Sequence, residues 1–226
     1  MPHCVRCGFT LIEVAIVLVI VGLLLAGIIK GQELMTGARV RSIIQQHDGV
    51  RTAYLGFIDR FRQPPGDYAA AAANITGVST ACGAAGNPGG GDGDSRIETA
   101  GGEYILAWEH LSKAGFLNGV YNCSGNTVVD QNSVPRNTYG GFLQLVYDDV
   151  YAGTTRNQHN LKSGNNMPSD LLAEIDRKAD DGNALSGSFR GSTYTSGAAT
   201  DSTCWDTGGV WSATAIALNC GGAVLY

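Results

Sequence analysis

An apolar run near the N-terminus constrains this chain more than any other feature. The run extends from Phe9 to Ile29, and Glu13 is its only ionisable residue. The run is long enough for a helix to cross a membrane. An acidic side chain deep in lipid costs roughly 2.5–3.5 kcal/mol. A cost of that size predicts that Glu13 has a positively charged partner.

A single long helix is predicted to begin with this run. No proline occurs between Phe9 and Arg62, after which Pro64 and Pro65 end the helical pattern. At the helical rise per residue, the stretch would span about 80 Å. Residues 9–29 are apolar all round, whereas residues 30–62 are an amphipathic continuation. Its apolar stripe, which predicts a seam against a globular head, consists of Ile43, Ile44, Val50, Tyr54, Phe57, Ile58 and Phe61.

The start of the run also carries a short motif. The residues from Gly8 to Val14 read GFTLIEV, which resembles the prepilin processing motif of type IV pilins and type II secretion pseudopilins. The resemblance implies that prepilin peptidase cuts between Gly8 and Phe9 and methylates the new amino terminus. Residues 1–8 would then be a leader peptide. The cut would create a cationic amine at Phe9, which is the predicted partner of Glu13.

This pairing predicts assembly of a filament. An amine and a carboxylate inside an apolar bundle attract strongly, and each is costly when unpaired. The Phe9 amine of one copy can meet Glu13 of another when the subunits are staggered, and such a head-to-tail contact propagates as an open helix. The resemblance implies further partners: related minor pilins, prepilin peptidase, an inner-membrane assembly platform, and the membrane itself before assembly.

The resemblance also implies a location. The protein would lie in the bacterial inner membrane with a periplasmic head, and later in a pilus or pseudopilus at or beyond the cell surface. Positive charges flank both ends of the run, so charge counting alone does not set this orientation. Many type IV pilins carry a proline in the long helix, and its absence here favours a pseudopilin or another pilin-like subunit.

Other interpretations of the same segment remain open. The run is longer than the apolar core of a secretory signal peptide, and no small-residue cleavage site follows it. A plain membrane anchor fits its length but leaves Glu13 unexplained. Two functional alternatives to a structural filament subunit are a minor pilin acting in adhesion or DNA uptake, and a membrane-anchored binding domain that does not polymerise.

Six cysteines fall into two groups. Cys4 and Cys7 lie in the predicted leader, and the mature chain retains Cys82, Cys123, Cys204 and Cys220. An even number of cysteines in an exported domain predicts two disulfides. Three pairings are conceivable, and local loop closure favours Cys82–Cys123 with Cys204–Cys220. The second pair would close a C-terminal loop like the disulfide loop of many pilins.

The remaining residues, 63–226, are predicted to form the head. Residues 103–114 and 170–179 have the pattern of short helices, and Gly115 provides a stop for the first. Residues 142–147 are predicted to be a strand, and residues 216–218 and 223–225 are short strand-like runs. The predicted fold class is α+β: a long N-terminal helix packed on a small antiparallel-sheet, pilin-like head with extra short helices.

Two acidic groups in the head are candidate metal ligands. Asp92 and Asp94, with Glu98 beyond them, carry the oxygen ligands that calcium prefers, but their spacing does not complete an EF-hand. Some pseudopilins bind structural calcium in a head loop, so the resemblance keeps calcium as a candidate cofactor; no other cofactor is expected. The acidic residues at positions 176, 180 and 181 are expected to cap or end a helix instead.

Enzymatic and nucleic-acid-binding functions are not expected. The four histidines are scattered, and the chain contains no Gly-x-Ser-x-Gly, His-Glu-x-x-His or phosphate-loop motif. His110 is expected at the surface or at the edge of the core. The formal net charge of −5 argues against a nucleic-acid surface. Five arginines between residues 39 and 62 leave a short basic groove as a minor alternative.

Overall fold

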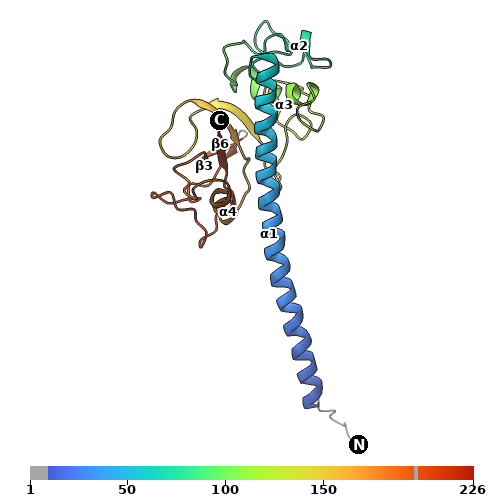
Figure 1. Cartoon of the computed structure of the whole chain (residues 1–226), viewed down its shortest axis with the longest axis vertical. Coiled ribbons are helices and arrows are strands. Elements are labelled where there is room, and N and C mark those ends of the chain that lie inside the picture. The colour runs from blue at the N-terminus through green and yellow to red at the C-terminus, as the bar shows by residue number, and fades with distance from the viewer. Residues whose placement is uncertain (1–9, 196–197) are drawn as a thin grey trace, which may run out of the picture. The chain divides into compact units, whose positions relative to one another are not determined.

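The computed structural model describes residues 10–195 and 198–226. Gly8 and Phe9, the predicted processing residues, therefore lie outside the described residues. The chain divides into two compact units, one up to Arg39 and the other Val40–Tyr226. The division falls within the long helix α1 (Figure 1). The predicted boundary between residues 62 and 63 marks the end of α1 rather than the division between the units.

Helix α1 comprises Leu11–Phe61, which confirms the prediction of one long helix. Its end has a local cause. Arg62 adopts a positive φ of 60°, although its backbone N–H still donates to the carbonyl of Ile58 at 2.8 Å. Two prolines follow, and a proline disfavours helical backbone in the residue before it.

The second half of α1 provides one wall of the hydrophobic core. Helix α3, Glu103–Lys113, packs against it (Figure 1). Tyr54 and Phe57 of α1 share this cluster with Ile105, Trp108 and Leu111 of α3. The buried residues of α1, which confirm the predicted seam, are Val40, Ile43, His47, Val50, Ala53, Tyr54 and Phe57.

A second apolar cluster joins the part of α1 at Val40 and Ile43 to helix α4, Ser169–Ala179, and to the C-terminal loop. Here Ile43 of α1 meets Leu172 and Ile175 of α4. The Cys204–Cys220 disulfide is buried in this cluster. Both predicted head helices are therefore confirmed. Two further short helices, α2 at Ala71–Asn74 and the 3₁₀ turn η1 at Ala100–Gly102, lie in the loops that precede α3.

The main sheet has four strands in the order β1-β2-β6-β3. These strands are β1 Gln144–Asp148, β2 Gln158–Lys162, β6 Gly222–Leu225 and β3 Phe189–Gly191. All three pairings are antiparallel, with Leu145 opposite Leu161 and Leu161 opposite Val224. A two-stranded ribbon pairs β4, Tyr194–Thr195, with β5, Ala198–Ala199. The helices and antiparallel sheet confirm the predicted α+β fold class.

Two strand predictions need correction. The strand predicted at residues 142–147 begins later, because Phe142 forms only an isolated bridge with Arg136. The predicted strand at residues 216–218 is wrong: this segment is a turn, and the Leu218 side chain is 69% exposed. The start of α4 holds this turn, since Ser169 N donates to the carbonyl of Ala217 at 2.9 Å and Ala217 N donates to Ser169 Oγ at 3.0 Å.

Candidate processing and assembly site

Glu13 participates in a capping box at the start of α1. Its Oε2 accepts hydrogen bonds from the backbone N and from Oγ1 of Thr10, both at 2.8 Å. In return, Glu13 N donates to Thr10 Oγ1 at 3.3 Å. Such a reciprocal pair satisfies two backbone donors that the first helical turn leaves free. Thr10 was not singled out from the sequence, although a Thr three residues before a Glu at the start of an apolar run is a recognised signal.

The helix that follows has exposed apolar side chains. Large apolar side chains from Leu11 to Ile29 are 44% to 89% exposed. This part of α1 is long and apolar enough to cross a membrane, by length and composition alone. Gly22 and Gly27 have open space around them, since a Cβ atom added to either would meet nothing within 4 Å. Exposed apolar surface on this scale requires lipid or other protein chains to cover it.

Both pairs of cysteines in the head are joined. Cys82–Cys123 connects the loop before α3 with the segment after it, and Cys204–Cys220 closes the C-terminal loop. This is the pairing that loop closure favours. Each bond belongs to one of the two apolar clusters, so it ties its loops to that part of the core.

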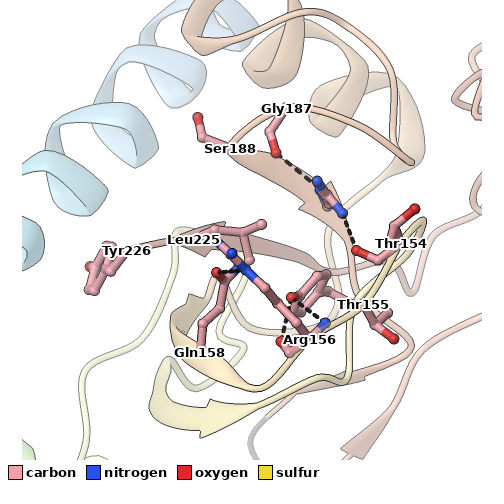
Figure 2. A pocket seen from close by; sticks show the side chains of 10 residues that line it. Thr154, Thr155, Arg156, Gln158, Gly187, Ser188, Leu225 and Tyr226 are labelled. Atoms are coloured by element: carbon pink, nitrogen blue, oxygen red, sulfur yellow. Dashed lines mark hydrogen bonds between the residues drawn. The ribbon is translucent and has the colours of Figure 1, made fainter.

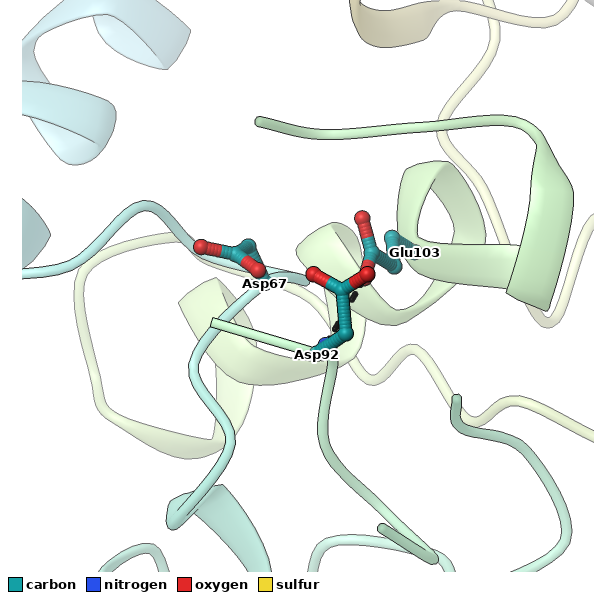
Figure 3. Close-up of side chains that lie close together, drawn as sticks. All are labelled: Asp67, Asp92 and Glu103. Atoms are coloured by element: carbon teal, nitrogen blue, oxygen red, sulfur yellow. Dashed lines mark hydrogen bonds between the residues drawn. The ribbon is translucent and has the colours of Figure 1, made fainter. Parts of the chain in front are cut away.

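The acidic residues of the head form two groups. Figure 3 shows the first group, in which carboxyl oxygens of Asp67, Asp92 and Glu103 lie within 4.8 Å of one another. Asp92 was predicted as a ligand, but Asp94 and Glu98 are not members of this group. Asp67 and Glu103 were missed because they lie far from Asp92 in the sequence and are brought to it only by the fold.

Hydrogen bonding assigns these two buried acids a structural task. Asp67 Oδ1 and Oδ2 accept from the backbone N of Gly93 and Ser95 at 2.6 and 2.8 Å. Glu103 Oε1 and Oε2 accept from the backbone N of Asp92 and Glu98 at 3.1 and 2.9 Å. All four oxygens are thus occupied by backbone donors. The two carboxyl groups anchor the loop at residues 92–98, which has no regular secondary structure.

Burial raises the pKa values of both Asp67 and Glu103. It raises the pKa of Asp67 to about 6, and neighbouring carboxylates add to the effect. The pKa of Glu103 is raised to about 7, again chiefly by burial and then by the charges of Asp67 and Asp92. The bonds from backbone N–H groups oppose both shifts, because they favour the charged form.

The second acidic group lies at the end of α4. Asp176 Oδ2 accepts from the indole nitrogen of Trp211 at 2.7 Å, and Asp176 Oδ1 accepts from Gly182 N at 3.1 Å. Asp180 accepts from the backbone of Ser188 and Phe189, and Asp181 accepts from Ser186 Oγ at 2.6 Å. These residues lie at the end of α4, where the sequence analysis expects them, and their contacts also join the helix end to the following loops.

The histidines among the described residues are buried or partly buried. His110 is fully buried, so the expectation of a surface or core-edge position is wrong. Its Nδ1 accepts from Gly66 N at 2.9 Å, and its Nε2 faces the carbonyl of Gly89 at 3.1 Å. Burial lowers the pKa of His110 to about 4. This imidazole is a neutral bridge between two loops, with its proton on Nε2.

Comparison with known proteins bears on the N-terminus. No curated protein and no solved structure matches the chain. Residues 5–29 match the family model described as the prokaryotic N-terminal methylation motif. The matched residues include Thr10 and Glu13 of the capping box and most of the exposed apolar part of α1. Residues 5–29 therefore carry the prepilin-type cleavage and methylation signature of type IV pilins and pseudopilins, which points to a structural, pilin-like substrate of prepilin peptidase.

Proposed function

We propose that this protein is a structural subunit of a type IV pilus-like or type II secretion pseudopilus filament. One observation carries the proposal: an acidic side chain lies at the start of a helix whose apolar side chains are exposed. Packing such helices against one another in a filament would bury this surface. The processing signature in the same segment supports the same assignment.

Glu13 retains a free oxygen for a second partner. Both bonds from Thr10 go to Oε2, and among the described residues Oε1 accepts no hydrogen bond. The capping box therefore fixes the carboxylate at the helix start without using all of its acceptors. We assign Oε1 to the cationic amine of Phe9 in a neighbouring copy, which sets the axial register of the filament.

Before assembly, the subunit lies in the membrane of the cell envelope. The apolar segment anchors the precursor in the inner membrane, and prepilin peptidase cuts between Gly8 and Phe9. We place the head in the periplasm, because two disulfides are expected in an oxidising compartment. An inner-membrane assembly platform and related minor pilins would then incorporate the subunit.

The test separates helix capping from charge pairing. Glu13→Gln keeps a side chain that can complete a capping box but removes the charge. Glu13→Ala removes both, and Glu33→Gln is the matched control, because Glu33 is an exposed residue of the same helix that pairs with Lys30 on the helix surface. Each variant is expressed in a strain lacking the native gene. Sheared surface material is examined by immunoblot and electron microscopy, and cleavage is followed by intact mass.

We expect both Glu13 variants to be cleaved but absent from filaments, and Glu33→Gln filaments to be normal. Filaments from Glu13→Gln at the wild-type level would overturn charge pairing and leave Glu13 a capping role alone. Wild-type protein that is cleaved yet remains wholly in the membrane fraction would overturn the filament proposal itself and favour an anchored binding domain.

A further inference from the structure

A pocket of about 510 Å³ opens on the surface of the second unit (Figure 2). Three segments form its walls: residues 151–158, residues 187–190, and Leu225 at the end of β6 together with Tyr226, which follows it. The volume lies within the range of small-ligand pockets. None of its residues belongs to the apolar helix, so the pocket is not explained by filament assembly.

Two arginines in this pocket have no carboxylate partner. Among the described residues, neither Arg156 nor Arg190 takes part in an ion pair. Arg190 donates from Nε to the carbonyl of Gly187 at 3.0 Å and from Nη1 to that of Thr154 at 2.8 Å, while its Nη2 has no acceptor in the described chain. Arg156 donates from Nε to Gln158 Oε1 at 2.9 Å, and within the same part of the chain both its terminal nitrogens remain free.

The buried side chain of Tyr151 positions both arginines. Its hydroxyl donates to the carbonyl of Arg156 at 2.6 Å and accepts from the backbone N of Arg156 at 3.0 Å. The guanidinium of Arg190 lies 5.5 Å from the centre of the Tyr151 ring, within cation–π distance. One aromatic residue therefore fixes the backbone of one arginine and the head group of the other. Such preorganisation lowers the entropy cost of binding.

Two acidic residues bear on this pocket: Asp180 accepts a hydrogen bond from the backbone N of the lining residue Ser188, and Asp181 interacts electrostatically with Arg190. Arg190 contributes to the lowered pKa of Asp181, but only as a minor cause after the hydrogen bonds from Ser186 and Asn183. Those bonds go to Asp181 Oδ2 and Oδ1, respectively, at 2.6 and 2.9 Å. Asp181 thus weakens the positive field of the pocket without occupying the free nitrogens of Arg190.

The rest of the lining is rich in hydroxyl and amide groups. Thr154, Thr155 and Ser188 contribute hydroxyls that make no hydrogen bond within the described chain, and Gln158 contributes a free amide nitrogen. A guanidinium matches the geometry of a carboxylate or phosphate and can bind it through two parallel bonds. Hydroxyl and amide groups around it match a hydroxylated ligand body.

We propose that this pocket binds a small anionic carbohydrate, with a carboxylate or phosphate group held by Arg156 and Arg190 and sugar hydroxyls facing the threonines and Ser188. Sugar acids and sugar phosphates both carry such an oxyanion. The proposal is independent of the filament: it holds for a subunit in a filament and for an anchored binding domain alike.

The test is a titration of the detergent-solubilised full chain by isothermal calorimetry. The probes are glucuronate, glucose 6-phosphate, inorganic phosphate and neutral glucose. We expect saturable binding of glucuronate or glucose 6-phosphate with a dissociation constant of about 1 mM or below, and at least about tenfold weaker binding of glucose. Tighter binding of one charged sugar identifies the anion as carboxylate or phosphate. Inorganic phosphate that binds as tightly as either sugar would overturn the carbohydrate part of the proposal.

Variants then localise the binding. Arg156→Gln and Arg190→Gln should each weaken the affinity about tenfold, whereas Arg156→Lys, which keeps the charge but not the planar fork, should have a smaller effect. Arg136→Gln is the matched control, because Arg136 is an exposed arginine that lies over Phe142 and lines no part of this pocket. Absence of saturable binding in the wild type, or equal affinity in all four variants, would overturn the proposal.

Discussion

The buried carboxylate of Glu109 accepts a hydrogen bond from the backbone N of Cys123 at 2.8 Å through Oε2. Its other oxygen, Oε1, accepts from Ser79 N at 2.7 Å. One donor belongs to Cys123 of the Cys82–Cys123 disulfide, and the other belongs to Ser79, three residues before Cys82 on the other loop. One side chain of α3 therefore joins the two loops by accepting a backbone hydrogen bond from each.

Removal of this carboxylate should destabilise the head strongly. Glu109→Ala leaves the buried N–H of Cys123 and the half-buried N–H of Ser79 without acceptors, which should cost about 2–4 kcal/mol of unfolding free energy. Urea unfolding of the detergent-solubilised chain, followed by tryptophan fluorescence, measures the loss. Glu174→Ala is the control: Glu174 pairs with Lys178 at 2.8 Å on the surface, and its loss should cost less than about 1 kcal/mol. Equal midpoints for the two variants would contradict this role.

His110 should make the head less stable in acid. The unfolded chain binds a proton near the ordinary histidine pKa of 6.5, whereas burial holds the folded pKa at about 4. Between these values the unfolded state binds more protons, so stability falls as the pH decreases, by up to about 3 kcal/mol. The measurement is the unfolding free energy from pH 7 to pH 4 for wild type and His110→Gln.

Glutamine can still accept from Gly66 and donate to Gly89, so this variant removes the titration while keeping the bridge. His47 and His159, whose pKa values burial also lowers to about 4, remain in both proteins and cancel in the difference. A constant difference between wild type and His110→Gln across the pH range would count against a neutral His110.

Glu103 should change the unfolding free energy with pH in the opposite direction to His110 and by a similar amount. Its folded pKa of about 7 lies above the ordinary value of 4.5, so the folded state binds more protons between these values. The stability contributed by Glu103 is therefore greatest at low pH and decreases as the pH rises through this window, by about 3 kcal/mol. Unfolding of Glu103→Gln and wild type from pH 4 to pH 8 measures the change.

The difference in unfolding free energy between wild type and Glu103→Gln has two parts. The part that changes with pH reports the ionisation of Glu103. The part that is independent of pH reports the backbone hydrogen bond that glutamine cannot accept. The slope of the pH-dependent part should have the opposite sign to that for His110→Gln, which lies on the same helix. Slopes of the same sign would show that burial does not control one of the two groups.

Gly66 should be far less tolerant of alanine than Gly86. Both residues have a φ of +89°, so alanine meets the same left-handed backbone strain at each. A methyl group at Gly66 would lie 2.3 Å from the carbonyl oxygen of Glu103, whereas one at Gly86 would have nothing within 4 Å. Gly66→Ala should therefore lose about 1–3 kcal/mol more than Gly86→Ala in urea unfolding. Comparable losses would contradict this close packing.

Local sequence patterns predicted the longer helices of the protein but not the strands β2 and β3. The apolar run and the absence of proline predicted α1. Helical spacing predicted its seam through Tyr54 and Phe57 and the helices α3 and α4. These features depend on residues close together in the chain, so periodicity reveals them. Periodicity misled at Ile216 and Leu218, because two hydrogen bonds to Ser169 hold that segment as a turn.

The sequence by itself determined the processing signature and the long helix. It also determined that Glu13, an acidic residue in an apolar run, requires a partner. Only the tertiary structure decided which polar groups the head buries. Asp67 and Glu103 anchor one loop, Glu109 joins two others, and Tyr151 contacts both the backbone of Arg156 and the guanidinium of Arg190. The reason is physical: a buried polar group is tolerated only where the fold supplies its partner, and here the partners come from distant parts of the chain.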